Sequence, residues 1–101
     1  MVRHIVVWTL KPNAEGADAR TNAERVKAAF EKLNGRIPGM LRLEIGLDFS
    51  RTKESGDVVL YSEFESRAAL EGYQEHPEHV ALKSFMRTVR DERRVVDYEV
   101  G

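Results

Sequence analysis

The chain has 101 residues, of which 42% are hydrophobic and 33% charged, with a formal net charge of −1 and no cysteine. This length and composition predict a single globular domain over residues 1–101. The lack of cysteine excludes disulfides and thiolate metal sites, and the balanced charge argues against a nucleic-acid partner. No apolar run is long enough to span a membrane, and the first residues lack the apolar core of a signal peptide, so we expect a cytoplasmic protein.

The N-terminal half predicts a strand, a helix and a second strand. Residues 5–10 are β-branched and aromatic on both faces of a strand, and Pro12 stops it. A helix is expected from about residue 17 to residue 34, because apolar residues recur at steps of three and four and Gly35 follows. Residues 40–49 alternate between apolar and polar, which predicts a strand with one buried face. That face would comprise Leu41, Leu43, Ile45, Leu47 and Phe49.

The C-terminal half predicts a strand, a broken helix and a last strand. Residues 58–64 form the third strand, and residues 95–100 form the last one. Between them, Ser66 is a suitable N-cap for a short helix, and Pro77 ends that helix and begins the next. The order βα-ββ-αβ predicts an α+β, ferredoxin-like split βαβ fold, with a four-stranded antiparallel sheet and helices on one face.

The predicted sheet is apolar on both faces, although helices in this fold cover only one. The first strand places Val6 and Trp8 on one side and Ile5 and Val7 on the other. A second apolar face needs a second cover, and the simplest cover is another copy of the chain. We therefore expect a homodimer that pairs through the open sheet face. The alternative interpretation is that these are the scattered exposed apolar side chains that monomers normally carry.

The most informative motif spans residues 73–79, Tyr-x-x-His-Pro-x-His, and it contains two of the three histidines of the chain. Pro77 at the first helical position would place His79 at the third, where the helix dipole disfavours a charged imidazolium. A neutral imidazole near pH 7 accepts protons, as a general base must. The motif therefore makes His79 a candidate catalytic base.

Two further catalytic candidates follow from this assignment. The hydroxyl of Tyr73 can donate a hydrogen bond to a carbonyl or enolate oxygen. His4, on the same face of the first strand as Val6, can orient His79 or bind a polar group of a substrate. His76 precedes a proline and caps the next helix or lies at the pocket mouth. The pocket lining is expected to comprise His76, Trp8 and Phe85.

Each of these residues also has a purely structural interpretation. Tyr73 can be a core tyrosine with a bonded hydroxyl, and two buried histidines can bridge helix and strand simply to satisfy polar groups. A zinc site from His76, His79, His4 and an acid such as Glu75 or Glu78 is less favoured, because the proline interrupts regular helical presentation. The mixed-charge residues from Arg87 to Arg94 are interpreted as a solvated helix end and loop.

Taken together, these features resemble the stress-responsive A/B barrel family, a dimeric ferredoxin-like α+β fold. The resemblance rests on residues 4–8, 37–40, 44–46, 64–66, 73–80 and 95–98, and the Tyr-x-x-His-Pro-x-His run is its most specific part. One plant branch of that family is a polyketide cyclase that closes a ring by intramolecular aldol condensation, without metal or organic cofactor. It has histidines at the positions of His4 and His79 and a tyrosine at that of Tyr73, but its substrate-pocket residues are not recognisably shared.

The resemblance therefore implies a small homodimer with one pocket per subunit and, as ligand, a small, partly apolar carbonyl compound. The first functional hypothesis is cofactor-free proton transfer, as in a cyclisation, an aldol-type closure or an isomerisation. The second is a non-catalytic stress-associated dimer that binds small molecules or serves as a scaffold. Related dimeric α+β barrels include cofactor-free oxygenases and haem degraders, whose site patterns are not found in this sequence.

Overall fold

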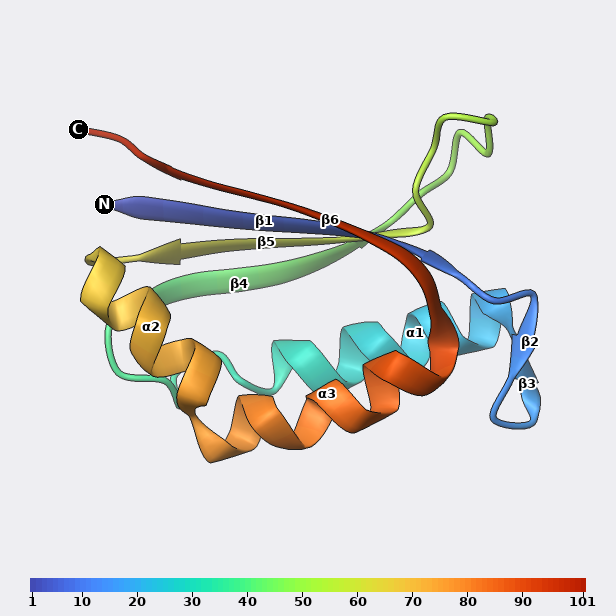
Figure 1. The fold of residues 1–101 in the computed structure, drawn as a ribbon, viewed down its shortest axis with the longest axis horizontal. Helices are drawn as coiled ribbons and strands as arrows, with labels where there is room; N and C mark the ends of the chain where they lie inside the picture. Colours follow the sequence, from blue (N-terminus) through green and yellow to red (C-terminus); the bar gives the residue numbers. More distant parts are fainter.

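The computed structural model describes all 101 residues as a four-stranded antiparallel sheet with three helices on one face (Figure 1). The strand order is β4-β5-β1-β6, which places the N-terminal strand beside the C-terminal one. A small hairpin of β2 and β3, absent from the prediction, precedes the first helix. This is the predicted ferredoxin-like α+β architecture. The elements are β1 Val2–Leu10, β2 Asn13–Ala14, β3 Ala17–Asp18, α1 Ala19–Glu31, β4 Met40–Leu47, β5 Val58–Phe64, α2 Arg67–Glu75, α3 Pro77–Val89 and β6 Arg90–Glu99.

The break between α2 and α3 lies where the sequence predicts it. The Oγ of Ser66 accepts a hydrogen bond from the N–H of Ala69 at 3.1 Å, which caps the start of α2. His76 has extended backbone angles, φ −63° and ψ 131°, and Pro77 is the first residue of α3. The chain therefore turns at His76, and both helices lie on the same face of the sheet (Figure 1).

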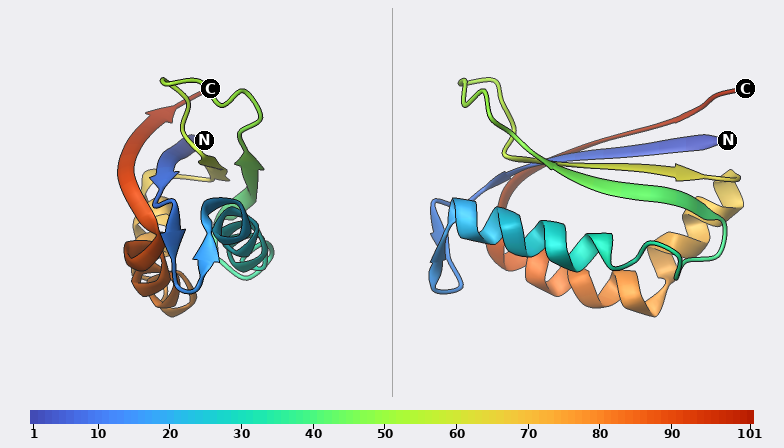
Figure 2. Two further views of the ribbon diagram at one scale, coloured as in Figure 1. Left: turned by 90° about the vertical axis from the view of Figure 1, so that its right-hand side faces the viewer. Right: turned by 180° about the vertical axis from the view of Figure 1, so that it is seen from behind.

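The core lies between the sheet and the helices. Every even-numbered residue of β1 is buried, and every odd-numbered one from Arg3 to Thr9 is half-buried, as a strand with one covered face requires. Helices α1 and α3 run side by side beneath the sheet, as the end-on view shows (Figure 2). Val26 and Phe30 from α1 and Met86 and Val89 from α3 fill the space below the strands.

The prediction of which residues of β4 are buried is wrong at both ends of the strand. The register against β5 shifts between Met40 and Arg42, so that Met40 is buried and Leu41 is 52% exposed. Phe49 lies beyond the end of β4 and is 92% exposed. The middle of the strand keeps the predicted alternation, with Leu43 and Ile45 buried.

The last strand begins at Arg90, directly after α3, rather than at residue 95. Its pairing with β1 runs from Leu10 opposite Arg90 to Val2 opposite Glu99. The charged residues predicted as a loop are therefore strand residues. Backbone groups form the ladder whatever the side chain, and charged side chains are common on an edge strand of this kind.

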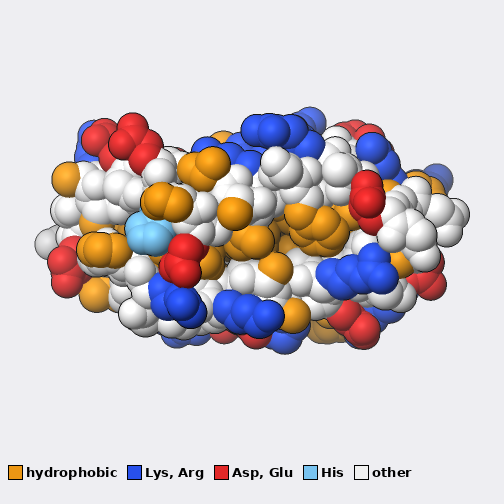
Figure 3. All heavy atoms as spheres, turned by 90° about the horizontal axis from the view of Figure 1, so that it is seen from below, with side chains coloured by type: hydrophobic (Ala, Val, Ile, Leu, Met, Phe, Trp, Pro, Cys, Tyr) orange, Lys and Arg blue, Asp and Glu red, His pale blue; other side chains and the backbone are white.

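The two outer surfaces of the molecule differ. The helix side presents intermixed basic and acidic side chains, with apolar side chains showing along its middle (Figure 3). The opposite side is the uncovered face of the sheet, and the loop between β4 and β5 rises from that side (Figure 1). None of the helices is both long and apolar enough to cross a membrane.

Candidate functional site

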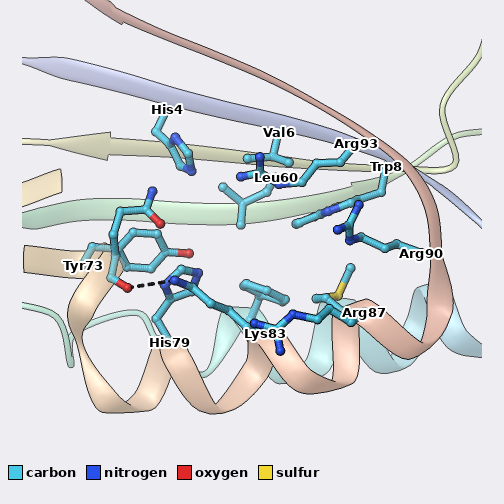
Figure 4. A pocket seen from close by; sticks show the side chains of 13 residues that line it. His4, Val6, Trp8, Leu60, Tyr73, His79, Lys83, Arg87, Arg90 and Arg93 are labelled. Atoms are coloured by element: carbon cyan, nitrogen blue, oxygen red, sulfur yellow. Dashed lines mark hydrogen bonds between the residues drawn. The ribbon is translucent and has the colours of Figure 1, made fainter. Parts of the chain in front are cut away.

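A cavity of about 280 Å³ lies between the sheet and the helices (Figure 4). This is close to the lower end of the ~300–1,000 Å³ range that small-molecule sites occupy. His4, Tyr73 and His79 all contribute to it, although they come from β1, α2 and α3. The full lining comprises His4, Val6, Trp8, Phe30, Leu60, Tyr73, Gln74, His79, Lys83, Met86, Arg87, Arg90 and Arg93.

Tyr73 and His79 form the closest aromatic pair of this cavity. Their rings are stacked, with centroids 4.0 Å apart and planes 24° apart. The hydroxyl of Tyr73 and the Nδ1 atom of His79 are both buried and have no partner at hydrogen-bonding geometry, although backbone groups of Tyr73 and Gln74 lie close enough to the His79 ring to act on its pKa. Buried polar atoms are normally bonded, so two adjacent ones without a partner indicate a place where a ligand or water binds.

Burial lowers the pKa of the His79 imidazole and raises the pKa of the Tyr73 hydroxyl. It lowers the pKa of His79 from 6.5 to about 4, with a smaller contribution from the positive charge of Lys83 one turn further along α3. It also raises the pKa of the Tyr73 hydroxyl well above its usual value. At pH 7 His79 is therefore a neutral imidazole and Tyr73 a protonated phenol. The pair offers one proton acceptor and one hydrogen-bond donor to the cavity.

His4 is held by a residue that the sequence reading did not single out. Its Nδ1 atom lies 2.5 Å from Oδ1 of Asp97, and these residues face each other across the β1–β6 pairing. The His4 side chain is 3% exposed and that of Asp97 is 46% exposed. A carboxylate at Nδ1 orients the ring and leaves Nε2 as the nitrogen available to a ligand. Asp97 is placed beside His4 by the antiparallel register between β1 and β6. A single sequence does not specify that register, so Asp97 could not be identified from the sequence.

Aromatic neighbours fix the positions of the three polar side chains. Phe64 lies 5.2 Å from the Tyr73 ring and 6.4 Å from the His4 ring between centroids, and Phe30 lies 6.3 Å from His79. Trp8 packs on Phe30 at 5.7 Å and lines the cavity, as predicted. Close packing of this kind restricts rotamers and so holds the polar groups in place.

Four basic residues line the cavity, and none of its lining residues is acidic. Lys83 and Arg87 come from α3, while Arg90 and Arg93 come from β6. The charged residues from Arg87 to Arg94 are mostly solvent-exposed, as the sequence predicted, but those from Arg90 onward form a strand rather than a loop. The spacing of His79, Lys83 and Arg87 could have indicated the two α3 residues, since steps of four stay on one helical face.

Two predicted lining residues lie outside the cavity lining. His76 uses its Nδ1 atom to accept the N–H of Glu78 at 3.1 Å, so it caps α3 instead. Phe85 is six residues from His79, roughly 120° around the helix, and packs against the core from the side of α3. No three His, Asp or Glu side chains in the structure are grouped in a way that could hold a metal ion.

Comparison with known proteins places the chain in a family. The family model described as Stress responsive A/B Barrel Domain matches residues 2–100. The chain belongs to this family. No curated protein matches the sequence.

Solved structures of similar proteins agree with this membership. A dimeric protein of unknown function and ferredoxin-like fold from Bacteroides fragilis is 31% identical, with a TM-score of 0.85 over 98% of this chain and 95% of that one. A Dabb family protein with a ferredoxin-like fold from Mesorhizobium loti is 27% identical, with a TM-score of 0.76 over 99% and 97%. A dimeric ferredoxin-like protein of unknown function from Jannaschia is 26% identical, with a TM-score of 0.74 over 98% of both chains.

Proposed function

We propose that this stress-responsive A/B barrel protein catalyses cofactor-free proton transfer on a small carbonyl compound. The observation that carries the proposal is the pair of buried, unpartnered polar atoms on Tyr73 and His79, next to His4 in one cavity. Leaving such an atom without a partner costs about 1–3 kcal/mol, and a carbonyl substrate with an acidic α-carbon would supply partners for both.

The chemistry follows from the protonation states of the two residues. A neutral His79 accepts the proton from the carbon next to the substrate carbonyl, and the electrons of that C–H bond move to the carbonyl oxygen. Tyr73 donates a hydrogen bond to the enolate oxygen that forms. Return of the proton to another carbon completes an isomerisation. Attack of the enolate carbon on a second carbonyl of the same molecule, followed by return of the proton from His79 to the new alkoxide, completes an aldol closure.

His4 has an orienting role in this proposal, and its pairing with Asp97 also favours a second assignment. The carboxylate of Asp97 fixes the His4 ring and leaves its Nε2 atom free to accept a proton from a ligand. In that assignment His4 takes the proton and His79 binds the carbonyl group. Separate substitutions of the two histidines distinguish the assignments.

The test is exchange of α-protons in D₂O, followed by proton NMR on a panel of simple ketones, keto acids and thioesters. The wild-type protein should accelerate the exchange of at least one class of compound. His79→Gln should reduce the acceleration by about 10²–10⁴-fold, and Tyr73→Phe by about 10²-fold or more. The control is His76→Asn, which keeps a helix cap outside the cavity and should exchange at the wild-type rate.

Unchanged exchange in His79→Gln, with loss of exchange in His4→Gln, would transfer the base to His4. Unchanged exchange in both variants would exclude the proposed site. A protein that is stabilised in thermal-shift measurements by a compound it leaves chemically unchanged would favour the non-catalytic binding dimer instead. The close stacking of Tyr73 on His79 is the feature that favours this second candidate, because it is also suited to a structural role.

The open face of the sheet supports a homodimer as the working form. Ile5, Val7 and Val59 are only half-buried there, and Val96 on the neighbouring strand is 59% exposed. Contiguous apolar strand surface of this kind marks an interface, and a two-fold dimer covers it with a second copy. The dimeric relatives described above support the same assembly.

A further inference from the structure

The cavity has two chemically different ends. His4, Tyr73 and His79 lie at one end, and Trp8, Arg87 and Arg90 lie toward the other (Figure 4). His79 and Arg87 are eight residues apart on α3, which corresponds to about 12 Å along the helix axis. His4 and Trp8 are four residues apart on β1, which corresponds to about 13 Å. Val6 and Leu60 lie between the ends, with the side chain of Arg93 beside them (Figure 4).

The four basic residues that line the cavity are not neutralised by the protein. Lys83, Arg87, Arg90 and Arg93 make no salt bridge, whereas five other arginines pair with glutamates: Arg20, Arg36, Arg42, Arg67 and Arg94. Lys83 donates to the carbonyl oxygen of Gln74 at 3.1 Å, and no hydrogen bond joins the three guanidinium groups to the protein. Four like charges around one hollow repel each other, so an anion bound among them would lower the electrostatic energy.

We infer that the cavity selects carbonyl compounds that carry an anionic group, a carboxylate or a phosphate ester. Arg90 and Arg93 on β6 hold the anion, and Lys83 and Arg87 on α3 add positive charge to the same cavity. Val6 and Leu60 contact the connecting hydrocarbon, and the carbonyl group reaches Tyr73 and His79. The planar guanidinium suits this role because it binds a carboxylate or a phosphate through two parallel hydrogen bonds. The position of the carbonyl rests on the proposed function, while the site for the anion rests on the cations alone.

The test compares matched acid and neutral probes. Binding to the protein is measured by calorimetry and ligand-observed NMR. The carboxylate probes are levulinate and longer-chain methyl-keto acids, each compared with its neutral methyl ester. The phosphate probes are dihydroxyacetone phosphate and inorganic phosphate. Wild-type protein should bind an anionic ketone about tenfold or more tightly than its neutral ester. The preference should weaken as salt is raised. Comparing the carboxylate and phosphate arms identifies the anionic group.

Two variants assign the effect to the arginines. The double variant Arg90→Gln with Arg93→Gln should lose about tenfold or more in affinity for the anionic ketone and leave the ester within about twofold. Arg20→Gln removes one charge from the solvent side of α1 and should leave both affinities unchanged. His79→Gln should still bind the keto acid while losing α-proton exchange, which separates this inference from the proposed function. Equal binding of acid and ester, no binding of any anionic ketone, or equal losses in the double variant and Arg20→Gln would overturn the inference.

Discussion

The two faces of the sheet are made by the same strands, yet only one of them is completed within a single chain. On β5, Leu60 points to the helices and is 1% exposed, whereas its neighbours Val59 and Tyr61 on the other face remain half-buried. On β1 the covered face contributes His4 and Trp8 to the cavity, and the open face contributes Ile5 and Val7 to a surface without cover. Alternation along a strand therefore separates the site from the surface proposed for dimerisation, and each can be changed without the other.

The largest expected effect is a loss of stability caused by a substitution on the covered face of the sheet. Leu60→Ala should lower the free energy of unfolding by about 2–5 kcal/mol, because it removes a buried side chain and leaves a cavity in the core. Val59→Ala, the adjacent residue on the open face, should cost about 1 kcal/mol or less when measured on the monomer. Urea denaturation of both variants measures the difference. Equal losses would mean that the open face is as well packed as the core.

An added charge on the open face should break the dimer and leave the cavity intact. Val96→Lys places an ammonium group in the apolar surface that a second copy would cover, so the dimer dissociation constant should rise about tenfold or more. Sedimentation or light scattering across a dilution series measures this change. Glu24→Lys, on the solvent side of α1, is the control for the added charge. A Val96→Lys protein that stays dimeric at all concentrations would argue against this face as the interface.

The third effect concerns pH and belongs to the covered face alone. The pKa of His79 is lowered to about 4 in the folded protein and is about 6.5 when unfolded, so the unfolded state binds more protons between these values. Stability is therefore fully present above pH 6.5 and falls as the pH is lowered toward 4, with a slope of at most about 1.4 kcal/mol per unit from this residue. Urea midpoints across this range should show a shallower slope in His79→Gln. An identical slope would mean that His79 is not buried as a neutral imidazole.

Local signals account for most of what was predicted correctly. Ser66 and Pro77 are recognisable because capping and a missing N–H act within a few residues, and these positions place the break before His79 where the structure has it. The family motif predicted that His4, Tyr73 and His79 belong together, and the structure places them in one cavity. Their catalytic roles remain a proposal.

The errors arose where long-range pairing decides the outcome. The bulge at Leu41 and the early start of β6 depend on the register between strands, and backbone pairing sets that register irrespective of local polarity. The charges from Arg87 to Arg93 are mostly solvent-exposed, as predicted, and the pairing of β6 with β1 also brings Arg90 and Arg93 to the lining of the cavity.

The amino-acid sequence by itself determined the order of the four long strands and the three helices, the helix break, and Tyr73 and His79 as proton-transfer candidates, because periodicity, capping and the Tyr-x-x-His-Pro-x-His motif act over short separations. Only the tertiary structure decided that Asp97 orients His4 and that four basic residues line the same cavity as His4, Tyr73 and His79. The physical reason is that these contacts join residues far apart in the chain, and their geometry exists only once the strands have paired and the helices have packed beneath them.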